Sequence, residues 1–71
     1  MALHDDVADE LAQRTIRALK DLNDTEIERE VADAIGASSP TLQETYLTAM
    51  RIRRAEARAK EVLTRIEATI R

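Results

Sequence analysis

Five residues near the N-terminus are of the types that bind metals or move protons. The stretch "LHDDVADEL" brings together His4, Asp5, Asp6, Asp9 and Glu10. A metal site needs several such side chains to converge on one point. On a helix these five side chains point in different directions around the axis, and Asp5 and Asp6 complement the helix dipole in a first turn. We therefore predict a solvated acidic turn here and no metal site.

The other residues offer no catalytic arrangement. The chain has no cysteine and one histidine, so no Cys/His or Ser/His/Asp nucleophile can be assembled. Its single glycine excludes a glycine-rich phosphate loop. We expect a protein that is not an enzyme and that holds neither a cofactor nor a metal.

A basic run, "RIRRAEARAKE" from Arg51 to Glu61, has three interpretations. It can be a membrane-surface helix, but no bulky apolar face of the kind that interfacial helices show accompanies it. It can be a nucleic-acid-binding arm, but no aromatic side chains interleave to stack on bases. It can also be a solvated helix face, supported by the attractive i,i+4 pair of Glu56 and Lys60. We favour the solvated face, with Arg51 and Arg54 as the exceptions if the protein binds DNA.

Size and composition predict one small domain over residues 1–71 with a thin core. A chain of 71 residues buries only roughly 60% of the surface that its unfolded form exposes. Tyr46 is the only aromatic residue and no disulfide is possible. Small scaffolds of this kind usually need an additional source of stability. We expect that source to be association with a second copy, as a homodimer or a higher oligomer.

Charge is distributed unevenly along the chain. Residues 1–40 carry four Lys/Arg and ten Asp/Glu, a net charge of −6, whereas residues 41–71 carry seven and four, a net charge of +3. This polarity suits head-to-tail pairing, or a basic face presented to an anion. No apolar run approaches the ~20 residues of a membrane span, and the acidic N-terminus does not resemble a secretory signal. The sequence therefore predicts a soluble, cytoplasmic protein that does not associate with membranes.

The scarcity of glycine and proline and the abundance of Ala, Glu, Arg and Leu predict an all-α protein. We expect three helices, over about residues 2–22, 24–35 and 39–71. Residues 1–50 should form a three-helix core. Residues 51–71 should continue the long third helix and serve oligomerisation.

The third helix carries two apolar stripes on opposite sides. Its first stripe consists of Leu42, Tyr46, Ala49 and Met50, which should pack on the first two helices. Its second stripe steps by three and four residues, as the interface of a coiled coil does. We call this second stripe the seam; it consists of Ile52, Ala55, Ala59, Val62, Ile66 and then Thr69 or Ile70. The seam should pack on a partner chain or on the long first helix.

The junction "EVADAIGASSPTLQETYL", Glu30–Leu47, holds the only glycine and the only proline. Gly36 permits the positive φ of a tight turn. Ser38 or Ser39 can cap the next helix, with Pro40 in its first turn. These features are typical of two capped helices that meet, and also of a helix-turn-helix motif.

The order of Ala32, Ile35, Gly36, Ser38, Thr41 and Leu42 resembles the helix-turn-helix of bacterial regulators. The stretch "REVADAIGASSPTL" is similar to the corresponding part of gluconate-repressor-type regulators. The resemblance covers about residues 25–47, and no β-wing follows it. It implies a DNA-binding transcription regulator whose third helix enters the major groove from Ser38 to Thr48.

The resemblance also implies roles for particular side chains. Ser38, Ser39 and Thr41 would donate to phosphates. Gln43 would read an adenine through its amide. Arg51 and Arg54 would meet the DNA backbone. The alternative function is a non-enzymatic helical adaptor or assembly subunit, which binds a partner protein through the seam.

Overall fold

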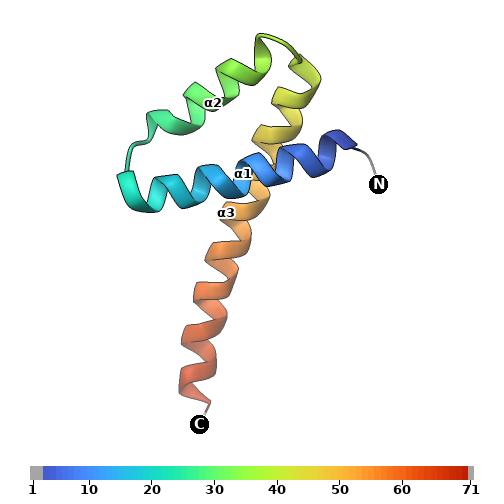
Figure 1. Cartoon of the computed structure of the whole chain (residues 1–71). Coiled ribbons are helices and arrows are strands. Elements are labelled where there is room, and N and C mark those ends of the chain that lie inside the picture. The colour runs from blue at the N-terminus through green and yellow to red at the C-terminus, as the bar shows by residue number, and fades with distance from the viewer. Residues whose placement is uncertain (1–2, 71) are drawn as a thin grey trace.

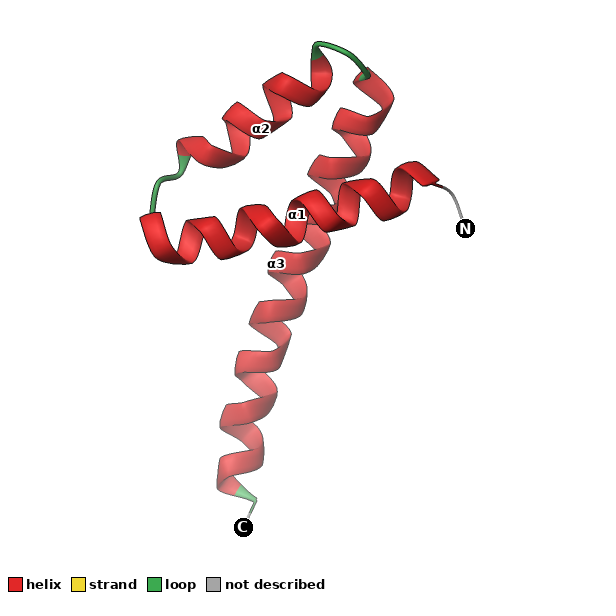
Figure 2. Ribbon diagram, in the orientation of Figure 1, coloured by secondary structure: helices red, strands yellow, loops and turns green. Residues whose placement is uncertain are grey.

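The computed structural model describes residues 3–70, and these form three helices joined by short turns (Figure 2). The helices are α1 (Leu3–Leu22), α2 (Glu26–Gly36) and α3 (Pro40–Thr69). No strand occurs within this range. The prediction of an all-α chain of three helices with a long third helix is confirmed, and the third helix runs unbroken from Pro40 to Thr69. The outermost predicted positions, residues 2 and 71, lie outside the described residues.

Short polar side chains mark the turn between α1 and α2. Asn23 adopts a positive φ of 51°, and its N–H donates to the Leu19 carbonyl over 2.8 Å. Asparagine tolerates this left-handed conformation better than most residues, so α1 ends there. Asp24 follows, and its carboxylate accepts a hydrogen bond of 3.0 Å from the Glu26 N–H. The first free amide of α2 is thereby satisfied.

The turn between α2 and α3 differs from the prediction at Gly36, which does not have a positive φ. Instead the chain keeps a right-handed conformation through Ala37, and the Ser39 N–H donates to the Ile35 carbonyl. The helix therefore ends without a left-handed residue. Ser39, not Ser38, then caps α3: its backbone is extended and its Oγ accepts from the Leu42 N–H over 3.1 Å. Pro40 is the first residue of α3, as predicted.

The core is small and combines large side chains of α3 with alanines of α1 and α2. Tyr46 and Met50 are the largest fully buried side chains. They pack with the other buried apolar residues, which are Ala8, Ala12, Ala32 and Ala49. Small residues let the helices approach one another, so the large side chains fill the space between them. The first stripe of α3 thus packs on the first two helices, as expected.

Figure 1 shows α1 lying across α3, while the C-terminal part of α3 extends away alone. Every residue from Arg54 to Ile70 is exposed, and the molecule measures 51 × 31 × 13 Å. We call residues 3–51 the head and residues 52–70 the arm.

Candidate functional site

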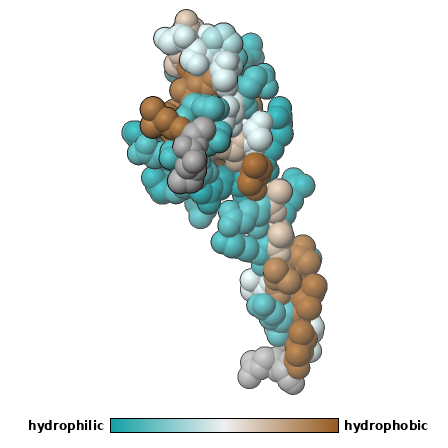
Figure 3. Space-filling model, turned by 90° about the vertical axis from the view of Figure 1, so that its right-hand side faces the viewer, coloured by the Kyte–Doolittle hydropathy of each residue, from teal (hydrophilic) through white to brown (hydrophobic). Residues whose placement is uncertain are grey.

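The seam lies on a side of the arm that the head leaves uncovered, and only its first residue, Ile52, borders α1. Its large side chains are strongly exposed: Ile52 at 62%, Val62 at 43%, Ile66 at 48% and Ile70 at 73%. Leu63, 54% exposed, widens this surface, although the seam pattern did not include it. Figure 3 shows apolar side chains gathered along one side of the arm. Of the two predicted packings, the one on α1 is therefore wrong, because α3 turns the seam outward.

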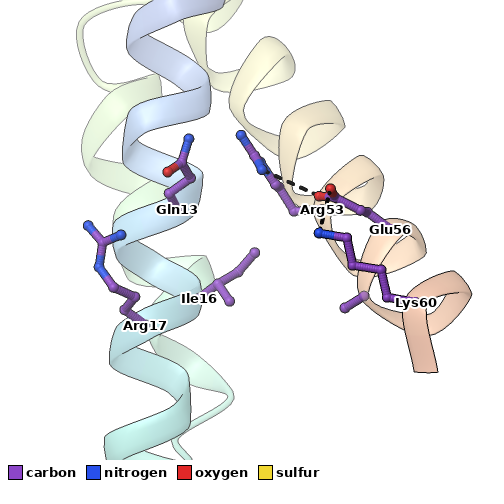
Figure 4. Close-up of a pocket in the computed structure, with 7 residues that line it drawn as sticks. Gln13, Ile16, Arg17, Arg53, Glu56 and Lys60 are labelled. Carbon is purple, nitrogen blue, oxygen red and sulfur yellow. Dashed lines mark hydrogen bonds and ion pairs between the residues drawn. The ribbon is translucent and has the colours of Figure 1, made fainter. Parts of the chain in front are cut away.

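Ion pairs occupy the side of α3 that faces α1, where the arm begins. Arg53 binds Asp9 of α1 through two hydrogen bonds, Nε to Oδ1 over 2.9 Å and an outer guanidinium nitrogen to Oδ2 over 2.6 Å. Glu56 contacts Arg53 over 3.4 Å and Lys60 over 3.2 Å. In Figure 4 these three side chains of α3 lie opposite Gln13 and Ile16 of α1. The predicted pair of Glu56 and Lys60 is confirmed.

The Asp9–Arg53 pair links the base of the arm to α1. Hydrogen bonds from Arg53 lower the pKa of Asp9, an effect that Gln13 reinforces through a further bond. Arg54, on the next position of α3, binds Glu28 of α2. Consecutive arginines thus tie the base of the arm to both other helices.

The residues that the helix-turn-helix resemblance assigns to DNA differ in exposure and in the bonds they make. Ser38, Thr41 and Arg51 are exposed. Ser39 is engaged as the cap of α3. Gln43, the expected base reader, turns inward, and its Nε2 donates to the Ala32 carbonyl over 2.9 Å.

The electrostatic surroundings of the first turns of α3 are acidic. A hollow beside Thr45 and Thr48 is lined by Asp5 and Asp9 of α1. On α2, three acidic side chains are exposed (Glu26, Glu30 and Asp33) against one basic side chain, Arg29, which lines a hollow beside Gln43. Carboxylates repel DNA phosphates, and charge neutralisation dominates non-specific DNA affinity. The geometry therefore gives the predicted DNA-binding residues little electrostatic support.

Three important residues escaped the analysis of the sequence. Asp9 was assigned to a solvated turn, and its partner Arg53 is 44 positions away. Thr15 is buried, and its hydroxyl shares a hydrogen bond of 2.8 Å with the Tyr46 hydroxyl. Leu63 is offset from the strict coiled-coil spacing. For Leu63 the sequence did hold a signal, because its helical position lies close to the apolar stripe of the arm. For Asp9 and Thr15 no local pattern indicated the partner.

Metal-binding and membrane-spanning features are not found in the described part of the chain. Between residues 3 and 70, no three His, Asp or Glu side chains gather closely enough to hold a metal ion. None of the helices in this range is both long and apolar enough to cross a membrane.

Comparison with protein-family models, curated proteins and solved structures gives no match. The helix-turn-helix resemblance accordingly stays a hypothesis from the sequence. Any functional conclusion has to come from the geometry of the chain.

Proposed function

We propose that this chain is a non-enzymatic assembly protein, which associates with a second copy of itself through the seam of its arm. The observation that carries the proposal is an apolar helix face that nothing between residues 3 and 70 covers. Contiguous apolar surfaces of this kind on small proteins mark interaction sites.

The arm needs a partner for its own stability as well. It is a helix of which residues 54–70 make no buried contact with the head. Most helical stability in proteins comes from packing of an apolar face, and the apolar face of the arm is exposed. Pairing would supply that packing.

The driving force has the required size. Fully burying a Val, Leu or Ile side chain stabilises by roughly 1.5–3 kcal/mol. Each copy offers five large, partly to strongly exposed side chains, which are Ile52, Val62, Leu63, Ile66 and Ile70. Together these contributions are of the order of the roughly 4–15 kcal/mol that association costs.

Charge favours a second copy as the partner. The front of the chain is acidic, net −6 over residues 1–40, and the back is basic, net +3 over residues 41–71. One copy therefore carries both halves of an attractive pair. Two copies of the chain can therefore attract each other without a charged surface from another protein.

DNA binding is the less supported function. The turn and the capped helix fit a helix-turn-helix, but Gln43 is bound to the Ala32 carbonyl and Arg54 to Glu28. Only Ser38, Thr41 and Arg51 of the expected DNA-binding set are exposed and without a side-chain partner among the bonds found in residues 3–70. The resemblance assigns these three residues to phosphates, and phosphate contacts position a protein on DNA without reading its sequence.

The mass of the protein in solution tests the proposal. We expect a dimer or larger species by light scattering at micromolar concentration. Ala59→Lys should yield a monomer, because it places a charge in the middle of the seam, whereas Ala68→Lys, the same change on another face of the arm, should not. A monomeric wild type, or equal effects of the two variants, would contradict the proposal.

A mobility-shift titration tests the competing function. We expect no retardation of fragmented genomic DNA at low salt. A shift that Arg51→Ala weakens would show instead that the helix-turn-helix interpretation is correct.

A further inference from the structure

We infer that the two arms pair antiparallel, with Ile52 facing Thr69 of the second copy, Ala55 facing Ile66 and Ala59 facing Val62. This inference rests on the proposed function and specifies its geometry. In this register the overlap includes the whole seam. At about 1.5 Å per residue the paired region is roughly 26 Å long.

The sizes of the seam residues favour this direction. In the antiparallel register every layer combines a larger and a smaller side chain: Ile52 with Thr69, Ala55 with Ile66, and Ala59 with Val62. The distance between the two helices can then stay uniform. Interiors pack at high density with few voids, and such layers satisfy that requirement.

A parallel pair in register would pack less well. Each residue would face its own copy, so Ala55 and Ala59 would form two small layers next to layers of paired Val62 and paired Ile66. A single distance between the two helix axes cannot suit both the alanine layers and the layers of larger side chains. Voids would remain at the alanines, or the larger side chains would clash.

The charges that flank the seam favour the parallel pair, but only weakly. Arg51, Arg58 and Arg65 recur every seven residues along one flank of the seam. Antiparallel helices bring this flank against itself, whereas parallel helices would bring Arg51 near Glu56 of the other copy. All four side chains are exposed, where solvent and salt screen charges strongly. Packing in the centre of the seam therefore decides the direction.

The head provides a second, independent observation. A hollow at the head end of the seam is lined by Thr45, Thr48, Ala49 and Ile52 of α3 and by Asp5 and Asp9 of α1. In the antiparallel register, Ile70 of the second copy arrives at this hollow. Its 73% exposed side chain would then lie against Ala49 and Ile52.

Charge agrees with this placement. The antiparallel arrangement brings the C-terminal end of each basic arm close to the acidic head of the other copy. The parallel arrangement would bring acidic head close to acidic head. Both the hollow and the charge distribution therefore select the same direction as the layer sizes.

Cysteine cross-linking tests the direction, because the natural chain has no cysteine. We would prepare Ile52→Cys, Thr69→Cys and the double variant, equilibrate each in a thiol–disulfide buffer, and measure covalent dimer on a non-reducing gel. Ala68→Cys, off the seam, controls for random collisions. Residues 52 and 69 of one chain are too far apart on a straight helix for an internal disulfide.

The expected result is mostly covalent dimer for the double variant and no more than the Ala68→Cys level for each single variant. Efficient cross-linking of either single variant would show a parallel pair and overturn the inference. A dimeric mass without any cross-link would overturn the register. A monomeric mass for the uncross-linked wild type would instead overturn the proposed function, including the case in which another protein's helix occupies the seam.

Discussion

At the scale of single residues, the junction between α2 and α3 depends on a close contact between Gly36 and Gln43. A Cβ atom built on Gly36 would lie 2.7 Å from Cδ of Gln43, which is too close. The Gln43 amide crosses Gly36 to reach the Ala32 carbonyl. Glycine therefore leaves room here for the Gln43 amide, and no positive φ requires it.

This contact predicts an effect of Gly36→Ala that depends on Gln43. In the wild type the new methyl group displaces the Gln43 amide, so the loss of a hydrogen bond worth about 0.5–1.5 kcal/mol offsets the gain in helix propensity. In the Gln43→Ala background the same change should stabilise by roughly 0.5–1 kcal/mol. Urea denaturation of the four proteins measures both effects. If glycine served a left-handed turn, the substitution would destabilise in both backgrounds.

Tyr46 should titrate above the ordinary tyrosine range. Burial raises the pKa of Tyr46, against a smaller lowering by its hydrogen bond to Thr15. As the only tyrosine, it can be followed alone by the absorbance of tyrosinate, whose midpoint should lie above the reference value of about 10. The buried, protonated Tyr46 contributes to the free energy of unfolding. Because its folded pKa is raised, this contribution is complete below the unfolded pKa and is lost as the pH rises through the folded pKa. A midpoint at or below the reference value would contradict the buried position.

The Thr15–Tyr46 bond itself predicts a modest cost for Tyr46→Phe. Thr15 would keep its bond to the Leu11 carbonyl, so its hydroxyl would still donate. We expect a loss of about 0.5–1.5 kcal/mol in the free energy of unfolding. Adding Thr15→Val should cost less in the Tyr46→Phe background than in the wild type, because the shared bond is already absent. Additive losses would show that the two hydroxyls do not interact.

At the scale of elements, α3 is one helix with two different tasks. Its first turns supply Tyr46 and Met50 to the core, and its last turns carry the seam. The change of face happens near Arg53, which is also where Asp9 of α1 holds the helix. The tie is therefore placed at the point where the helix leaves the head.

The Asp9–Arg53 tie predicts a pH-dependent contribution to stability. The pKa of Asp9 is lowered in the folded protein, so the stabilisation is present above the unfolded pKa of about 3.9. It is lost as the pH falls through the folded value. The difference in unfolding free energy between wild type and Asp9→Asn should be largest near neutral pH and shrink in acid. Asp21→Asn, at the far end of α1, is the control, and a difference that does not change with pH would contradict the tie.

At the scale of the whole molecule, a head and a protruding arm are expected to fold fully only in an assembly. Binding that is confined to the folded state stabilises it by mass action. We therefore expect the melting temperature to rise with protein concentration. Ala59→Lys should abolish this dependence and reduce the helical circular dichroism signal, because an unpaired arm frays. Ala68→Lys should preserve both, and a melting temperature independent of concentration in the wild type would contradict assembly.

Local signals were sufficient to predict the helices from the sequence. Pro40 and a serine cap indicate the start of α3, and the residues near Asn23 indicate the end of α1. Both signals are local, because the end groups of a helix are satisfied by residues close by in the chain. The apolar stripes also followed from spacing alone, since helical periodicity fixes which residues share a face. The seam was identified in this way.

Only the tertiary structure decided how these elements meet. Whether the seam packs on α1 depends on the angle at which α1 crosses α3, and no local pattern encodes that angle. The bonds of Gln43 to Ala32 and of Arg53 to Asp9 join residues 11 and 44 positions apart. Such partners are chosen by packing across the core, which brings distant side chains together after the helices are placed. For this reason the sequence assigned Gln43 to DNA, whereas the fold uses it to join two of its own helices.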